Sequence, residues 1–84
     1  MMNRRSRTRL VDLMLSAYVD WREACFEVDA AYRAWGRGTG PHADMAFARY
    51  TTALEQEERA AALYATFVRD VRQTVCAREV AAAA

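Results

Sequence analysis

An apolar residue recurs at alternating intervals of three and four residues between positions 11 and 35 of this chain. The stripe comprises Val11, Met14, Tyr18, Trp21, Cys25, Val28, Tyr32 and Trp35. Such spacing, kept over four heptads, is the a/d pattern of helices that pack lengthwise against another helix. The sequence therefore predicts one long amphipathic helix over about residues 8–35, roughly 40 Å long at 1.5 Å per residue.

A second stripe with the same spacing begins after a glycine-rich stretch. Residues 36–41 hold Gly36 and Gly38, which can end a helix by adopting positive φ, and Pro41, which is tolerated in a first helical turn. The pattern then resumes in a second helix, predicted over about residues 42–80, at Phe47, Tyr50, Leu54, Ala61, Tyr64, Val68, Val71 and Val75. We therefore expect a single domain, residues 1–84, with an all-α fold: an antiparallel two-helix hairpin of coiled-coil type.

The register of the hairpin can be tested because the numbers of facing residues should add to one constant. One register aligns seven layers, which include Trp35 with Phe47, Tyr32 with Tyr50 and Tyr18 with Tyr64. Alanine also recurs every seven residues beside the stripes, at Ala17, Ala24 and Ala31 and at Ala46, Ala53 and Ala60. These alanines leave two possibilities open, a close approach of the two helices or the docking of a further helix.

Several large apolar residues lie off the main stripes and gather near the open end of the predicted hairpin. This open-end patch consists of Leu10, Leu13, Leu15, Val19, Leu63 and Phe67. A two-helix rod would leave the patch in water, and a contiguous exposed apolar patch usually marks an interface. We therefore expect the hairpin to dimerise into a four-helix bundle or to bind a different helical partner. The expected function is a non-enzymatic protein–protein interaction module, a scaffold or an adaptor.

Glu57 interrupts the second stripe and faces Cys25 in this register. Three interpretations are open: a buried carboxylic acid beside a thiol, a solvated side chain that pairs with an arginine such as Arg22, or a polar layer. Polar residues at inward heptad positions fix register and partner choice in coiled coils. Cys25 and Glu57 are therefore a candidate polar layer.

The N-terminal arginines, Arg4, Arg5, Arg7 and Arg9, form the one dense cluster of charge in the sequence. An arginine arm of this kind could contact phosphates, so an accessory protein that binds nucleic acid is the alternative function. No recognition helix or base-stacking platform accompanies the cluster. A solvated basic helix end and an acidic partner surface are the other interpretations.

No pattern of catalytic or metal-binding residues is found. The one histidine, His42, is in the turn, and the two cysteines are far apart in the predicted hairpin, so neither a zinc site nor an internal disulfide is expected. We expect no enzyme activity and no cofactor. The absence of a long apolar run predicts no membrane span, and the basic start lacks the apolar run of a secretory signal. Alanine and arginine excess without any lysine is typical of a GC-rich bacterial genome, and a cytoplasmic location is expected.

Trp35-Gly36-Arg37-Gly38 at the turn gives the chain a resemblance to the Trp-x-Gly family of small exported helical hairpins. Members carry Trp-x-Gly between two helices and act as exported dimers. Here the glycines follow Trp35 at the first and third positions, not the second. The Tyr-x-x-x-Asp/Glu export signal of the family is also missing, since Val68 stands four residues after Tyr64. The resemblance implies a minor alternative function, a small exported hairpin protein.

Overall fold

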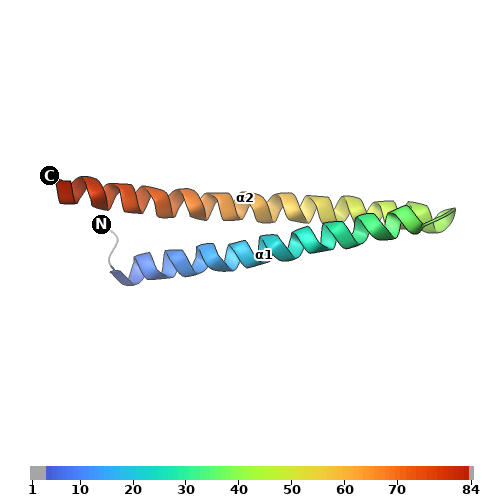
Figure 1. The fold of residues 1–84 in the computed structure, drawn as a ribbon, viewed down its shortest axis with the longest axis horizontal. Helices are drawn as coiled ribbons and strands as arrows, with labels where there is room; N and C mark the ends of the chain where they lie inside the picture. The colour runs from blue at the N-terminus through green and yellow to red at the C-terminus, as the bar shows by residue number, and fades with distance from the viewer. Residues whose placement is uncertain (1–3, 84) are drawn as a thin grey trace.

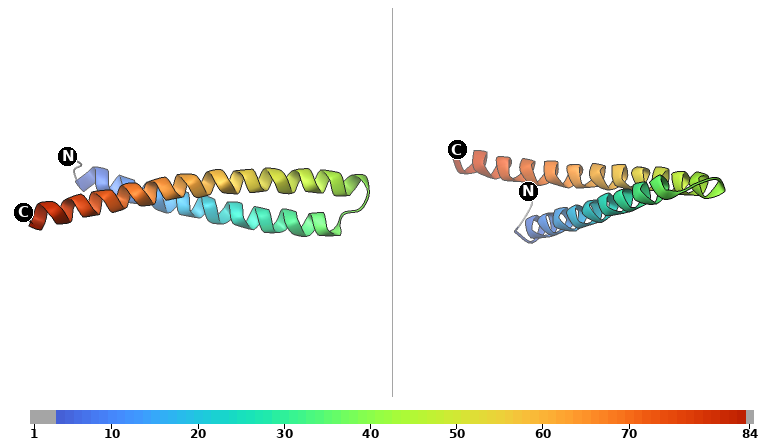
Figure 2. Two further views of the ribbon diagram at one scale, coloured as in Figure 1. Left: turned by 90° about the horizontal axis from the view of Figure 1, so that it is seen from above. Right: turned by 45° about the vertical axis from the view of Figure 1, so that its right-hand side comes forward.

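The computed structural model describes residues 4–83 and is an antiparallel hairpin of two α-helices (Figure 1). Helix α1 spans Arg4–Arg37 and helix α2 spans Pro41–Ala83, so both helices exceed the predicted bounds. The rod is 66 Å long, with both termini at one end and the turn at the other. The helices lie close together over most of the rod and separate toward the termini, an end called the open end below (Figures 1 and 2).

Residues 38–40 make the turn, and two backbone hydrogen bonds close it. The amide of Gly38 donates to the carbonyl of Trp35 (3.1 Å), and the amide of Ala43 donates to the carbonyl of Gly40 (3.0 Å). Gly36 lies inside α1, and the glycine with positive φ is Gly40, at 59°. The prediction that Gly36 and Gly38 would supply the positive φ was therefore wrong. The left-handed residue belongs to the start of α2 and not to the end of α1.

The helices meet along their alanine lines and not along the centres of the predicted stripes. Ala17 and Ala53, 3% and 7% exposed, are the buried residues within the described chain. Trp21 and Trp35 of the predicted α1 stripe also lie between the helices and are half-buried, whereas Tyr18 lies on one flank and is 42% exposed. A methyl side chain lets two helix backbones approach closely and gain dispersion contacts. Compared with the prediction, each helix is therefore turned about its own axis so that its alanines face the other helix.

Three aromatic contacts between the helices confirm the predicted register. The rings of Trp35 and Phe47 have centroids 5.1 Å apart, those of Tyr32 and Tyr50 5.6 Å, and those of Tyr18 and Tyr64 5.5 Å. The structure therefore differs from the predicted packing only in how far each helix is turned about its own axis. The position of one helix along the other is as predicted.

Candidate interaction surface

Two aromatic trios, two heptads apart, join the helices. Each contains a Tyr and a Trp of α1 and a Tyr of α2: Tyr18–Trp21–Tyr64 near the middle of the rod, and Tyr32–Trp35–Tyr50 near the turn. The Trp and the α2 Tyr stack in both trios, with centroids 5.7 and 5.5 Å apart and interplanar angles of 11° and 15°. Offset stacking contributes about 0.5–1.5 kcal/mol beyond the burial of area. The trios therefore hold the register at two levels.

Glu57 has a hydrogen-bond partner that the sequence did not indicate. The indole Nε1 of Trp21 donates to Oε1 of Glu57 across the two helices, at 3.0 Å in a partly buried position. Arg22, the partner considered from sequence, instead places its guanidinium over the ring of Phe26, 5.6 Å from the centroid. Cys25 is half-buried and has a free thiol. The polar contact at this level therefore joins Glu57 to Trp21, and its role in specifying the register stays a prediction.

One flank of the hairpin carries an apolar strip built from both helices. On α1 the strip lies beside the Trp21–Trp35 line, and on α2 it lies beside the Tyr50–Tyr64 line. Its members recur every seventh residue: Val11, Tyr18, Cys25 and Tyr32 of α1, with Phe47, Leu54, Ala61, Val68 and Val75 of α2. Five of them are 38–55% exposed, and the other four are half-buried. The strip contains no charged side chain over its whole length.

The opposite flank of the hairpin is mostly polar. At the corresponding heptad positions it carries Leu13, Asp20, Glu27, Ala34, His42, Arg49, Gln56, Leu63 and Asp70. Near the turn this flank forms an open groove of about 710 Å³, with alanines along its floor and Glu27, His42 and Arg49 among its lining residues. Because the groove is open and is lined by alanines and charged or polar side chains, it lacks the enclosed apolar character of an ordinary ligand pocket.

The open-end patch predicted from sequence does not lie on one side of the rod. Leu10 and Phe67 are half-buried next to the helix–helix contact, and Leu10 also lines a groove of about 530 Å³ between the separating helices. Leu13, Leu15, Val19 and Leu63 are 40–53% exposed. Successive helical residues are rotated by about 100°, so Leu13 and Leu15 of α1 face different sides. Their role as an interface stays a prediction.

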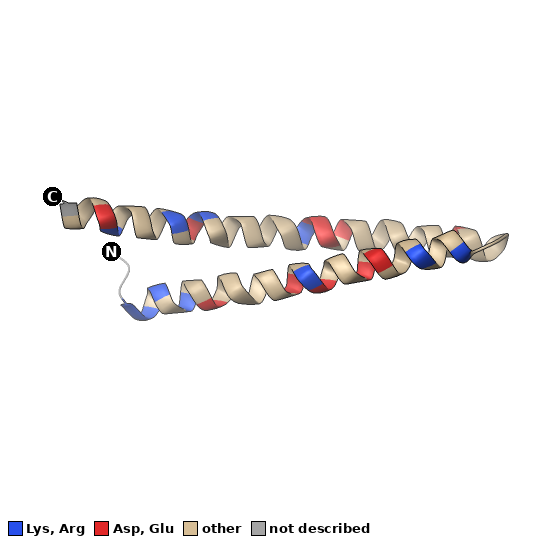
Figure 3. Ribbon diagram, in the orientation of Figure 1, with Lys and Arg blue, Asp and Glu red and all other residues tan. Residues whose placement is uncertain are grey.

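The N-terminal arginines lie in the first two turns of α1 and not in an extended arm. Arg4, Arg5 and Arg9 are exposed, and Arg7 is half-buried. They lie at the same end of the rod as the last turns of α2, which carry Arg72 and Arg78 (Figure 3). The open end is therefore basic on both helices.

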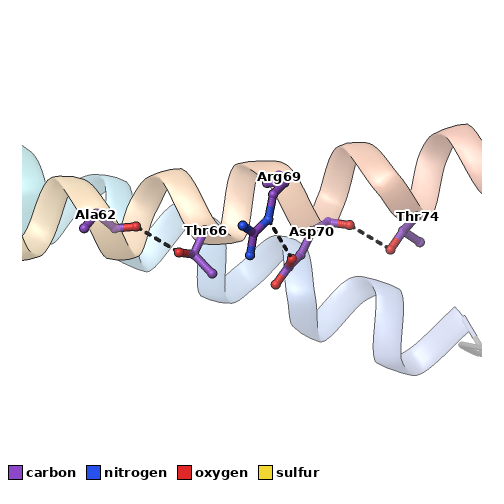
Figure 4. Close-up of polar contacts among 5 residues, drawn as sticks. All are labelled: Ala62, Thr66, Arg69, Asp70 and Thr74. Atoms are coloured by element: carbon purple, nitrogen blue, oxygen red, sulfur yellow. Dashed lines mark hydrogen bonds and ion pairs between the residues drawn. The ribbon is translucent and has the colours of Figure 1, made fainter.

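Polar side chains in the second half of α2 make their hydrogen bonds and ion pair within the helix itself (Figure 4). The hydroxyl of Thr66 donates to the carbonyl of Ala62 at 3.0 Å, and that of Thr74 donates to the carbonyl of Asp70 at 2.9 Å. Arg69 Nε lies 3.7 Å from Oδ1 of Asp70 in an exposed ion pair, which contributes little to stability. These groups do not assemble into a catalytic or binding constellation.

Among residues 4–83, no three His, Cys, Asp or Glu side chains lie close enough together to hold a metal ion. Neither described helix has an apolar stretch long enough to cross a bilayer. Comparison with known proteins finds no family model, curated protein or solved structure that matches this chain.

Proposed function

We propose that this chain is a non-enzymatic interaction module, a scaffold or adaptor whose apolar surface is completed by another helical chain. A homodimer or a complex with a different hairpin would give a four-helix bundle. The observation that carries the proposal is the large accessible surface of the single chain, 6721 Å². A compact monomer of 9.5 kDa exposes only about 5,000 Å² by the usual size scaling.

The shape of the rod leads to the same conclusion. Its radius of gyration is 18.8 Å, whereas a compact chain of this length has about 12 Å. Two helices in contact bury one line of side chains each, so most large apolar residues stay in contact with water. Packing a second hairpin against the first would bury a second line on every helix, as in the four-helix bundles of small proteins.

Thermal unfolding followed by far-UV circular dichroism tests this function when it is repeated over a hundredfold range of chain concentration. We expect the midpoint to rise with concentration, or the isolated chain to be only partly helical, because folding is coupled to association. A fully helical monomer that unfolds cooperatively at a concentration-independent midpoint would contradict the proposal. Such a chain would need no partner.

The basic open end supports nucleic-acid binding as the second candidate function. Arg7 and Arg78 line one groove between the helices, and Arg4, Arg5, Arg9 and Arg72 belong to the same end of the rod, so several guanidinium groups could contact one phosphate backbone. Retention on a short DNA or RNA duplex should then fall steeply with salt, because counterions are released on binding. Replacing the four N-terminal arginines by glutamine should abolish retention. Salt-insensitive or absent retention by the unmodified chain would remove this candidate.

A further inference from the structure

We propose that the partner on the apolar strip is a second copy of this chain, packed with the two glycine turns at opposite ends. This inference rests on the proposed function and deepens it by naming the partner, the surface and the orientation. Each copy would present α1 to α1 and α2 to α2, and every neighbouring pair of helices in the bundle would be antiparallel.

The contrast between the two flanks selects the side that is covered. The strip has nine heptad positions and no charged residue, while six of the nine corresponding positions on the opposite flank are polar or charged. Burying unpaired charges costs far more than burying apolar groups gains. The strip is therefore the flank that a partner can cover without burying a charged side chain.

The area of the strip is sufficient for a dimer. Exposures of 38–55% on Val11, Tyr18, Tyr32, Phe47 and Val75, with the half-buried members added, amount to roughly 600 Å² per copy. Two copies would then remove roughly 1,200 Å² from water, which reaches the lower end of the range for stable, specific interfaces. Tyr and Phe side chains supply most of it, and aromatic residues are enriched at the centres of interfaces.

The spacing of the strip makes it complementary to itself. Its members recur every seventh residue on both helices, so a copy turned end over end places strip residues opposite strip residues again. The half-buried small residues Cys25 and Ala61 lie along the middle of the strip. They leave room for the larger side chains of a second copy, as knobs-into-holes packing requires.

The distribution of charge selects the orientation. The stacked rings of Trp21 and Tyr64 mark one level of the rod. On the open side of this level, residues 4–21 and 65–83 contain seven arginines and four carboxylates, a formal side-chain charge of +3. Residues 22–64, on the turn side, contain five arginines and seven carboxylates, a charge of −2. Figure 3 shows both colours along the rod, with blue in the first turns of α1 and red densest in the middle of both helices.

A parallel pair would stack two halves of charge +3 on each other, whereas the antiparallel pair lays each half of charge +3 over a half of charge −2. Complementary potentials of this kind fix register and orientation more than they raise affinity. The charges therefore choose between two arrangements that the apolar strip alone would allow equally.

A distance between two labels tests the orientation. Thr39→Cys in a chain with Cys25→Ala and Cys76→Ala places one spin label at the turn of each copy. Thr39 lies about 18 residues from the centre of the strip on α1 and 22 residues from Ala61, its centre on α2, so antiparallel copies predict a label separation of roughly 50–65 Å. A separation below about 25 Å, roughly the width of a bundle, would mean parallel copies and would overturn the proposal. It would leave the function as an interaction module intact.

A matched pair of substitutions on α2 tests the surface. Val75 lies in the strip and Leu63 on the opposite flank, and they are 49% and 50% exposed. Val75→Glu should weaken self-association at least tenfold in sedimentation equilibrium, and Leu63→Glu should change it less than threefold. The reverse result would assign self-association to the open-end patch and overturn the strip. Circular dichroism at high concentration checks that both variants remain helical.

The helicity and oligomeric state of the unmodified chain distinguish a wrong partner from a wrong function. A poorly helical monomer would overturn self-association and keep the need for a different helical partner. A stable, cooperative monomer would overturn both.

Discussion

Replacing Trp21 by Phe should destabilise the hairpin more than the same substitution at Trp35. Both Trp side chains stack on a Tyr of α2 in trios of matching geometry, so both substitutions lose a similar ring area. Trp21 alone of the two donates a hydrogen bond to Glu57, at 3.0 Å. A hydrogen bond to a charged group contributes about 1.5–3 kcal/mol. Because this bond is only partly buried, we expect Trp21→Phe to cost about 1–2 kcal/mol more than Trp35→Phe.

Urea unfolding at one fixed chain concentration, followed by far-UV circular dichroism, measures the difference. A double-mutant cycle with Glu57→Met, which keeps the length of the side chain but removes the acceptor, isolates the contact. The coupling energy should again be about 1–2 kcal/mol. Equal costs for Trp21→Phe and Trp35→Phe, with a coupling energy near zero, would show that the polar contact does not hold the register.

Three further predictions concern the seam, the turn and the basic end. Ala53→Leu should cost about 1–3 kcal/mol in urea unfolding by forcing the helices apart, whereas Ala62→Leu on the exposed side should be close to neutral; equal effects would contradict the alanine seam. Gly40→Ala should destabilise by about 1 kcal/mol because φ is positive there, and Gly36→Ala, where an added Cβ meets nothing within 4 Å, should stabilise by about 0.5–1 kcal/mol in the same assay. Replacing the four N-terminal arginines by glutamine should leave the thermal midpoint nearly unchanged, since surface charges contribute little; a large drop would give them a structural role.

The hairpin itself follows directly from the sequence because two long heptad patterns flank a glycine-rich turn. The register was also predictable, since facing aromatic residues can be aligned by number alone. Heptad spacing identifies a broad apolar arc on each helix but not the line within the arc that meets the other helix. Alanine size decides that line, and Ala17 and Ala53 became its centre. Tyr18, which was predicted to lie between the helices, therefore lies on the flank in the structure.

The candidate surface was less predictable for the same reason. Leucines outside the stripes, such as Leu13 and Leu15, suggested an interface because they are apolar. They are two residues apart, however, and therefore lie on different sides of α1. The α1 residues of the strip were predicted to lie in the contact between the two helices. In the structure they lie beside this contact, because each helix is turned about its axis relative to the prediction. The Trp21–Glu57 hydrogen bond was missed because its donor was counted as an apolar core residue, although its Nε1 needs a partner when it is partly buried.

The absolute mass of the chain in solution, measured by light scattering across concentration, tests the central claim most directly. Self-association through the apolar strip predicts a discrete species of twice 9.5 kDa that dissociates on dilution. A helical chain that stays at 9.5 kDa at every concentration would contradict it.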